Sequence, residues 1–389
     1  MPIYAITSIA LNYLPKARVM FSTLRKFHPD WKLAVIIVDE EIPELTTRIE
    51  QMEEFDEAIY ISSLDIGNGE GGLLDTAQKK QWIFKHNIVE ACTAVKGAAM
   101  KRILSRGDCE SVFFFDPDML ITDRLDLLIG YFEKGHSILL TPHGTEPETR
   151  LDAIWDNEVG ALRWGIYNLG FLGIKNDEEG NRFVTWWKDR LDYYCYVDLA
   201  NGVFTDQSWC DMAPAFFDGV KILRDPQFNV ATWNLTHRHI SGDNIDNMLV
   251  NGKQKMAIFH FSGFDKGAQL VMLKKYGSEM AILFELREWY IAACESYEDP
   301  TFTGILWHYG YFDNGEPISL KQRELFRTRV DLQKAFLNPF ASGVESYQAW
   351  YASKQKHEYM NDMSRMHKSK VMTMIFKRYR KLRYFFQKN

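Results

Sequence analysis

Two uninterrupted apolar runs, each followed by an aspartate, constrain the fold of this chain most strongly. The first run is Leu33–Val38, followed by Asp39, and the second is Val112–Phe115, followed by Asp116. A short apolar run without alternating polar residues is typical of a strand buried on both faces of a parallel sheet. Because ligands of open α/β sheets bind at the carboxyl ends of the strands, Asp116 is predicted to lie at a binding edge.

Strand-like and helix-like segments alternate along the first half of the chain. This alternation indicates an α/β fold with a mostly parallel central sheet and flanking helices. The segment Gly67–Asp75 carries four glycines and is predicted to be a loop. The expected strands are Ile3–Ile9, Leu33–Val38, Ala58–Ile61, Ser111–Phe115, Ser137–Leu140 and Ala257–Phe261; the expected helices are Pro15–His28, Glu44–Met52 and one or two within Gln81–Ser105.

Three regions follow from this pattern: an α/β domain over 1–265, a helical and loop-like extension over 266–360, and a basic tail over 361–389. The tail holds nine Lys or Arg residues and one Asp, so its charge is +8. Because the net charge of the whole chain is −6, the remainder carries −14. An acidic body repels phosphates, so nucleic acid is not an expected partner.

The tail itself has an amphipathic pattern over Val371–Phe386, with apolar residues near one face and Lys and Arg on the rest. This pattern favours a helix that lies on an anionic membrane surface. The alternative is a packing helix, for example at the contact of a homodimer.

The compartment is expected to be the cytoplasm, with peripheral attachment to the inner face of the membrane through the tail. Five scattered cysteines form no CxxC pair, which is typical of thiols in a reducing compartment. The start Met1–Tyr4 lacks the features of a signal peptide, and no apolar run approaches the length of a membrane-spanning helix.

The triplet Asp116-Pro117-Asp118 is the strongest candidate for chemistry. Two carboxylates two residues apart can converge on one hard cation where the backbone turns, and Pro117 favours an end to the strand. A Mg²⁺ or Mn²⁺ held in this way bridges substrate phosphates and neutralises a leaving diphosphate. The alternative is an ordinary polar turn after a core strand.

Other candidates depend on this triplet for their interpretation. His260 ends an apolar segment just before Gly263, so its imidazole is a potential third metal ligand and the backbone near Gly263 a potential phosphate contact. Lys96 offers a cation for phosphates, and Asn168 and the pair Asp206-Gln207 offer polar groups among apolar neighbours. The alternatives are a structural histidine at a strand end and a lysine on a solvated helix face.

Taken in order, these segments resemble the GT-A fold of nucleotide-sugar glycosyltransferases, in particular family 8-like retaining enzymes and bacterial relatives that build surface glycans. The resemblance covers about Ile3 to Asp265 and includes Asn12-Tyr13-Leu14-Pro15, Thr93-Ala94-Val95-Lys96, Phe115-Asp116-Pro117-Asp118 and Tyr167-Asn168-Leu169-Gly170. It implies a Rossmann-like, mostly parallel sheet with flanking helices, plus a helical C-terminal extension.

The resemblance also implies roles for individual residues. In the family's pattern, Tyr13 stacks on the uracil, Asp39 contacts the base or ribose, and Lys96 faces the diphosphate. Asp116, Asp118 and His260 match the ligands of Mn²⁺ or Mg²⁺, and Asn168, Asp206 and Gln207 match the catalytic stretches that hold the transferred sugar. The full set expected to bind the nucleotide-sugar is Thr7, Asn12, Tyr13, Asp39, Lys96, Asp116 and Gly263.

The sequence departs from the family at two places. Ser8-Ile9-Ala10 replaces the usual acidic residue after the first strand, and Lys266 is only a candidate for a lysine that often follows the metal histidine. The implied function is transfer of a hexose, with retention, from a UDP-sugar to a glycan or lipid-linked acceptor in bacterial surface polysaccharide synthesis. Two alternatives stay open: a nucleotidyltransferase that makes nucleotide-sugars, and a non-catalytic sugar-binding or scaffold domain.

Overall fold

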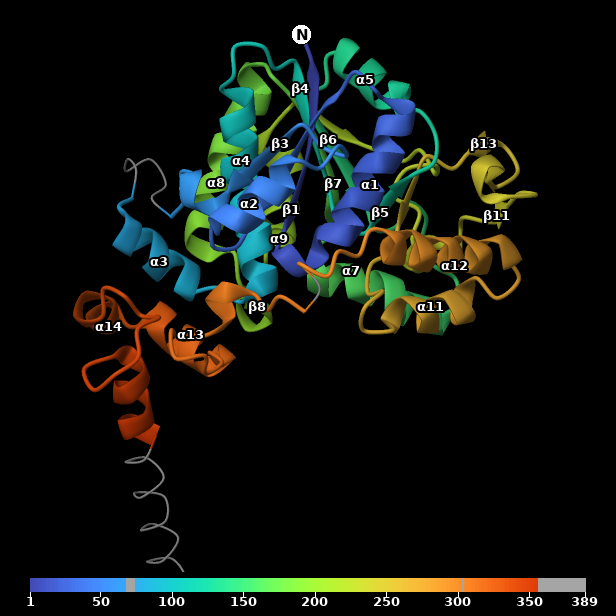
Figure 1. The fold of residues 1–389 in the computed structure, drawn as a ribbon. Helices are drawn as coiled ribbons and strands as arrows, with labels where there is room; N and C mark the ends of the chain where they lie inside the picture. The colour runs from blue at the N-terminus through green and yellow to red at the C-terminus, as the bar shows by residue number, and fades with distance from the viewer. Residues whose placement is uncertain (68–73, 303, 356–389) are drawn as a thin grey trace, which may run out of the picture. The chain divides into compact units, whose positions relative to one another are not determined.

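The computed structural model describes residues 1–67, 74–302 and 304–355, and the chain divides into two compact units, Met1–Gly310 and Tyr311 onward (Figure 1). The first unit contains a seven-stranded sheet in the order β10-β6-β7-β4-β1-β2-β3. β7 runs antiparallel to both of its neighbours, and every other pair in this sheet is parallel. The predicted α/β class with a mostly parallel central sheet is therefore confirmed. The strands are β1 (Ile3–Ile9), β2 (Lys32–Ile37), β3 (Glu57–Tyr60), β4 (Ser111–Phe115), β6 (Ile138–Pro142), β7 (Tyr167–Lys175) and β10 (Val220–Ile222).

Helices cover both faces of the central sheet (Figure 1). Apolar side chains of α1 and α5 pack with Val35, Phe113 and Leu139 in one large core. On the other face, α4 packs against β1, β4 and α8, and its Gly97 comes so close to α8 that an added Cβ would lie 2.8 Å from Cα of Lys188. The two apolar runs are buried because helices lie above and below them. The helices of this part are α1 (Leu14–Phe27), α2 (Pro43–Glu50), α3 (Thr76–Phe84), α4 (Ile88–Leu104), α5 (Asp126–Glu133) and α8 (Glu178–Tyr194).

Two helices, α3 and α4, lie in the region where the sequence predicted one or two helices. α4 begins at a capping box in which the Asn87 side chain accepts from the Glu90 N–H and the Glu90 side chain accepts from the Asn87 N–H. α3 begins at an equivalent box formed by Asp75 and Gln78. A capping box satisfies backbone donors that a helix start leaves unpaired, so each box fixes a separate start.

A second core lies outside the central sheet. The expected strand Ala257–Phe261 is present as β14 (Ile258–His260), but it pairs antiparallel with β5 (Met119–Ile121) in a sheet of two strands. Apolar residues of this pair pack with α11 (Ala268–Tyr276) and α12 (Ala281–Ser296), which confirms the helical character predicted beyond Asp265. Smaller elements are α6 (Leu151–Ala153), α7 (Val159–Trp164), α9 (Gln207–Cys210), α10 (Ala213–Phe216), the hairpin β8 (Val197–Asp198) and β9 (Val203–Phe204), and the sheet β11 (Ile240–Ser241), β12 (Leu249–Val250) and β13 (Gln254–Lys255).

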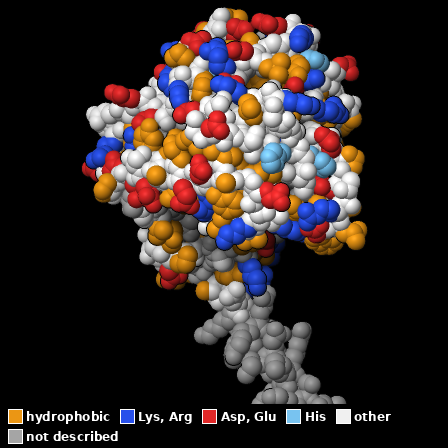
Figure 2. All heavy atoms as spheres, turned by 90° about the vertical axis from the view of Figure 1, so that its right-hand side faces the viewer, with side chains coloured by type: hydrophobic (Ala, Val, Ile, Leu, Met, Phe, Trp, Pro, Cys, Tyr) orange, Lys and Arg blue, Asp and Glu red, His pale blue; other side chains and the backbone are white. Residues whose placement is uncertain are grey.

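The second unit is described up to residue 355 and contains α13 (Leu320–Thr328) and α14 (Val330–Ala335). The predicted amphipathic segment Val371–Phe386 lies outside the described residues. None of the helices in the described ranges has the length and apolar character to cross a membrane. The predicted boundary at residue 265 falls within the first unit and stays a prediction about function. Figure 2 shows acidic and basic side chains interspersed over the face in view.

Candidate metal centre and active site

Three potential metal ligands meet at the carboxyl end of β4. The strand ends at Phe115, and β5 begins again at Met119, so the intervening Asp116-Pro117-Asp118 forms a turn. The Phe261 N–H donates to the carbonyl of Asp118 at 2.9 Å, which brings the end of β14 alongside this turn. One ligand atom from each of Asp116, Asp118 and His260 lies within 4.8 Å of the others.

The tautomer of His260 suits metal binding. Its Nδ1 lies 3.2 Å from Oδ1 of Asn168 and 3.3 Å from Oδ1 of Asn229. The N–H of Gly170 donates to the same Asn168 atom, which identifies that atom as an oxygen. Because Nδ1 faces oxygen acceptors, it carries a proton, so Nε2, 3.2 Å from Oδ1 of Asp118, is the nitrogen that can offer a lone pair to a metal.

The charges of the three ligands influence one another. Burial raises the pKa of Asp118, but His260, Lys16 and a backbone hydrogen bond together leave that pKa below its usual value. Burial lowers the pKa of His260, but Asp118 and Asp116 outweigh it and leave that pKa raised. Burial holds the pKa of Asp116 above its usual value. Two carboxylates therefore attract a positive charge to Nε2, and a divalent cation satisfies the same demand.

Gly170 lies at a close approach between the backbone of β7 and the candidate metal ligands. A Cβ at this position would lie 2.5 Å from Cε1 of His260, 2.8 Å from Cε of Met119 and 2.9 Å from Oδ1 of Asn168. The antiparallel direction of β7 places its first residues at the carboxyl edge of β4, and the Asp116 N–H donates to the Gly170 carbonyl at 2.7 Å. The imidazole therefore rests directly on the backbone of β7.

Lys96 lies beneath this centre and is 3% exposed. Its Nζ lies 2.9 Å from Oδ2 of Asp206 and 3.4 Å from Oδ1 of Asp116, and it donates to the carbonyl of Leu169 at 2.9 Å. Burial lowers its pKa, but the two carboxylates outweigh burial and raise it. Three oxygens thus surround the ammonium group, and the lysine holds Asp116 in place.

The three residues predicted to be catalytic are brought together around Lys96 and His260. Asp206 is 1% exposed and accepts from the Thr205 hydroxyl at 3.0 Å as well as pairing with Lys96. The Oε1 atom of Gln207 accepts from Nδ2 of Asn168 at 3.2 Å and from the Leu169 N–H at 3.0 Å. Asn168 in turn orients His260, so this buried network supports the metal ligands from below.

A cleft of about 230 Å³ opens beside the triplet. Its lining includes Ser8, Tyr13 and Thr93 together with Lys96 and the Asp116–Asp118 turn. Tyr13 is half-buried, and its hydroxyl donates to the carboxylate of Asp265. The tyrosine that the resemblance assigns to base stacking thus lines the same cleft as the candidate metal ligands.

Four other predicted nucleotide contacts are not among the residues that line this cleft. Thr7 is fully buried in β1, and Ser8 lines the cleft in its place. Asn12 is exposed and lines a separate pocket with Arg18 and Tyr297. Gly263 has a positive φ of 78° in an exposed turn. Their contacts with a nucleotide, and that of Asp39, remain predictions.

The carboxylate of Asp39 contacts His308, which lies far along the chain. Its Oδ1 accepts from the backbone N–H of His308 at 3.0 Å and lies 2.7 Å from Nδ1 of the same residue. Its side chain is 0% exposed, and burial raises its pKa although His308 acts in the opposite direction. Contact between Asp39 and a ribose would require His308 to move or to take part.

The sequence did not single out Lys16, Asn229 or His308. Lys16 is largely buried, pairs with Asp265 and lies 4.2 Å from the centre of the Tyr13 ring. Its position directly after Asn12–Pro15 is the one signal that could have drawn attention to it. Asn229 has a positive φ of 54°, a conformation that asparagine tolerates better than most residues, and no local motif marks it.

The chain matches no known protein-family model. It is 23% identical over 269 residues to the uncharacterized protein YfnD of Bacillus subtilis (strain 168), covering 66% of this chain and 76% of that protein. It is 31% identical over 100 residues to the uncharacterized protein YfnF of the same organism, covering 26% of this chain and 33% of that protein.

Several solved structures also align with the chain. The galactosyltransferase LgtC, in complex with donor and acceptor sugar analogs, has a TM-score of 0.41 and 15% identity, covering 76% of this chain and 97% of that one. The glycosyltransferase GlyE of Streptococcus pneumoniae TIGR4 has a TM-score of 0.39 and 17% identity, and the match covers 76% of this chain and 64% of that one. Mouse xyloside xylosyltransferase 1 has a TM-score of 0.35 and 12% identity, and the match covers 68% of this chain and 98% of that one. Because these values are low, the function of this chain is inferred from its own residues.

Proposed function

We propose that the chain is a metal-dependent glycosyltransferase that moves a hexose from a UDP-sugar to a glycan or glycolipid acceptor. The observation that carries the proposal is the centre formed by Asp116, Asp118 and His260, in which the imidazole presents Nε2 to the two carboxylates. This donor set suits Mn²⁺, which accepts imidazole nitrogen with carboxylate oxygen, and also Mg²⁺ when water completes its shell. The centre adjoins a cleft lined by Tyr13.

The bound cation would supply neutralisation of the diphosphate charge as the bond to the sugar breaks. Tyr13 would stack on the base, as the family resemblance implies. Lys96 would act by holding Asp116, because three protein oxygens already surround its ammonium group. Lys16, whose charge contributes to the lowered pKa of Asp118, is the cation we assign to the diphosphate, in exchange for its present partner Asp265.

The sugar would lie over the network of Asn168 and Gln207, which fixes the ligand geometry beneath it. The acceptor oxygen would form its bond to the anomeric carbon on the face that the diphosphate leaves, which is the retaining outcome. Asp206 is buried and paired with Lys96, so we assign it a positioning role through that lysine. Positioning and fixed charges would supply most of the rate increase.

The wider setting follows from the sequence. A role in bacterial surface polysaccharide synthesis, on the cytoplasmic face of the membrane, would agree with the basic amphipathic pattern of Val371–Phe386. If this segment instead packs against a second copy of the chain, it would form the contact of a homodimer. Between enzyme classes, a nucleotidyltransferase is disfavoured because Ile3–Arg18 contains no glycine for a phosphate-binding loop.

The test is calorimetric binding of UDP with and without Mn²⁺, followed by a screen of UDP-sugars for Mn²⁺-dependent UDP release. We expect Asp118→Asn to weaken Mn²⁺-dependent UDP binding by about 100-fold, since it removes a charged ligand. Asp246→Asn, on a side chain that is 75% exposed, is the matched control and should bind normally. Unchanged binding by Asp118→Asn would refute the metal assignment. Release of pyrophosphate from UTP and a sugar phosphate would instead identify a nucleotidyltransferase.

A further inference from the structure

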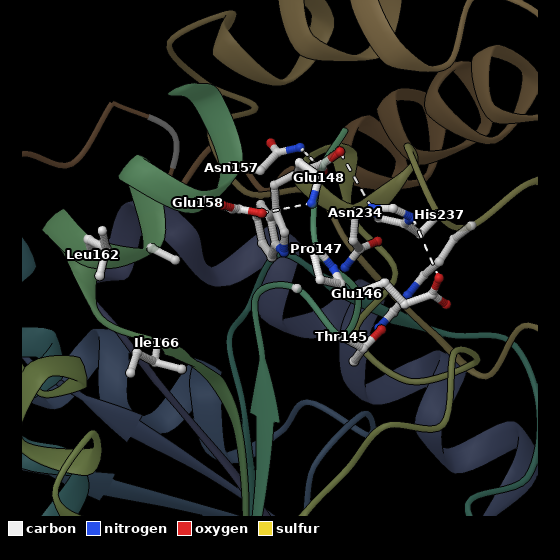
Figure 3. A pocket seen from close by; sticks show the side chains of 14 residues that line it. Thr145, Glu146, Pro147, Glu148, Asn157, Glu158, Leu162, Ile166, Asn234 and His237 are labelled. Atoms are coloured by element: carbon white, nitrogen blue, oxygen red, sulfur yellow. Dashed lines mark hydrogen bonds and ion pairs between the residues drawn. The ribbon is translucent and has the colours of Figure 1, made fainter. Parts of the chain in front are cut away.

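A second pocket, with a volume of about 410 Å³, lies in the first unit. Three segments line it: the loop after β6, the helical stretch from a π-helical turn over Ile154–Glu158 into α7, and the loop around His237. Figure 3 shows Leu162 and Ile166 on one side and Glu146 with His237 on the other. The pocket thus has an apolar side and a polar side.

Trp233 connects this pocket to the metal centre. It lines the pocket, and the centre of its ring lies 5.4 Å from that of His260, edge to face. The ring of His143 lies 5.3 Å from Trp233, and its Nε2 is 3.4 Å from Nδ2 of Asn168. A ligand in this pocket would therefore be one side chain away from the candidate metal ligand.

The polar groups of the pocket are not all satisfied by the protein. Nε1 of Trp233 is buried and has no hydrogen-bond partner among the described residues. Glu158 uses one carboxylate oxygen to accept from the Glu148 N–H at 2.7 Å, and Glu146 is 68% exposed with only a 3.8 Å contact to His237. A buried donor without an acceptor is costly, so a ligand oxygen that reached the indole N–H after a shift of the side chains covering it would be favoured.

Glu148 has a different role from the other two carboxylates. Its Oε1 accepts from Nδ2 of Asn157 and from the hydroxyl of Thr236, both at 2.6 Å, and its Oε2 lies 3.4 Å from Nε2 of His237. Its side chain is 6% exposed. Glu148 therefore ties the three lining segments together, and Glu146 and Glu158 are the exposed carboxylates that line the pocket.

The apolar side completes the pattern. Leu162 is 81% exposed and Ile166 is 46% exposed, although both are aliphatic and line the pocket. A pyranose ring has C–H faces that pack on apolar side chains and hydroxyl groups at its edge that both donate and accept. Trp233 offers a donor, and Glu146 with Glu158 offers acceptors. Anionic sugars are disfavoured because the two carboxylates repel them.

We propose that this pocket holds a neutral pyranose residue of the acceptor, with its hydroxyl groups toward Trp233, Glu146 and Glu158. This inference rests on the proposed function, because a transferase needs an acceptor site beside its donor site. Arg238, which also lines the pocket, offers the opposing possibility of an anionic ligand. Its guanidinium is buried and donates to the carbonyl of Phe228 at 2.7 Å, which favours a structural role.

The test is saturation-transfer NMR of the intact protein with methyl galactoside and methyl glucoside as neutral probes and methyl glucuronide as the anionic probe. We expect transfer to the neutral glycosides and none to the glucuronide. Glu158→Gln and Trp233→Phe, which removes the indole N–H but keeps an aromatic ring, should each weaken neutral binding at least about fivefold. Glu288→Gln, on a side chain that is 74% exposed, is the control and should bind as the native protein does.

Three results would overturn the proposal: preferential binding of the glucuronide, no transfer to either neutral glycoside, or neutral binding that survives both pocket substitutions. Failure of the proposed function is read separately, from UDP and Mn²⁺ binding by the native protein. Glycoside binding without UDP binding would leave a sugar site but no transferase. If the protein binds UDP and the pocket substitutions leave glycoside binding unchanged, the protein is a transferase whose acceptor site lies elsewhere.

Discussion

Replacing Gly170 with alanine tests whether the backbone of β7 sets the position of the metal histidine. The added Cβ would lie 2.5 Å from Cε1 of His260, whereas ordinary van der Waals contact begins at 3.4 Å. The imidazole must therefore retreat by about 0.9 Å, the difference between these distances. Metal–ligand distances tolerate only about 0.2 Å, so the imidazole would leave the coordination sphere or the metal would bind in a distorted site.

We expect Gly170→Ala to weaken Mn²⁺ binding by about 10-fold to 100-fold, the range seen when the support of a metal ligand is lost. The same substitution should lower the free energy of unfolding by about 1–3 kcal/mol through overpacking. The assays are calorimetric titration with Mn²⁺, and urea unfolding in the presence of a chelator.

Gly173→Ala is the matched control on the same strand. Its Cβ would lie 2.8 Å from Cε1 of Phe113 and 3.2 Å from Cδ1 of Leu139, so it overpacks the core but touches no metal ligand. We expect a similar loss of stability with Mn²⁺ affinity preserved. If Gly170→Ala bound Mn²⁺ as tightly as the native protein, His260 would not be a ligand. Equal losses of affinity in both variants would mean that general destabilisation explains the effect.

Two further predictions concern buried charges. Lys96→Met should lower the free energy of unfolding, measured in urea, by about 3–5 kcal/mol, because it leaves the buried carboxylate of Asp206 unpaired. The double variant Lys96→Met, Asp206→Asn should recover part of this loss. If it recovered none, the reasoning would be contradicted. Burial and Arg124 lower the pKa of His28, whose Nε2 accepts from the Leu125 N–H at 2.9 Å. The unfolded chain therefore binds the proton more tightly, so stability is complete above about pH 6.5 and falls as the pH drops below it. His28→Gln should reduce the difference in Tm between about pH 7.5 and about pH 5.5, whereas a control His239→Gln at an exposed position should not.

The sequence determined the sheet and one of its binding edges. The runs Leu33–Val38 and Val112–Phe115 become strands buried on both faces, because a segment without polar positions has no face that tolerates water. The carboxyl end of the second run then carries Asp116 and Asp118, and the turn at Pro117 brings both to the candidate metal centre. These are local consequences of composition and spacing.

The tertiary structure decided which distant groups meet at that edge. His260 reaches the centre through β14, which pairs with β5 outside the central sheet, and its tautomer depends on Asn168 and Asn229. Asp39 follows its strand as predicted, but its carboxylate contacts the imidazole of His308, 269 residues away. Periodicity reports only which face of an element is buried. The partner of a buried polar group is chosen by packing among elements remote in sequence, so no local pattern reveals it.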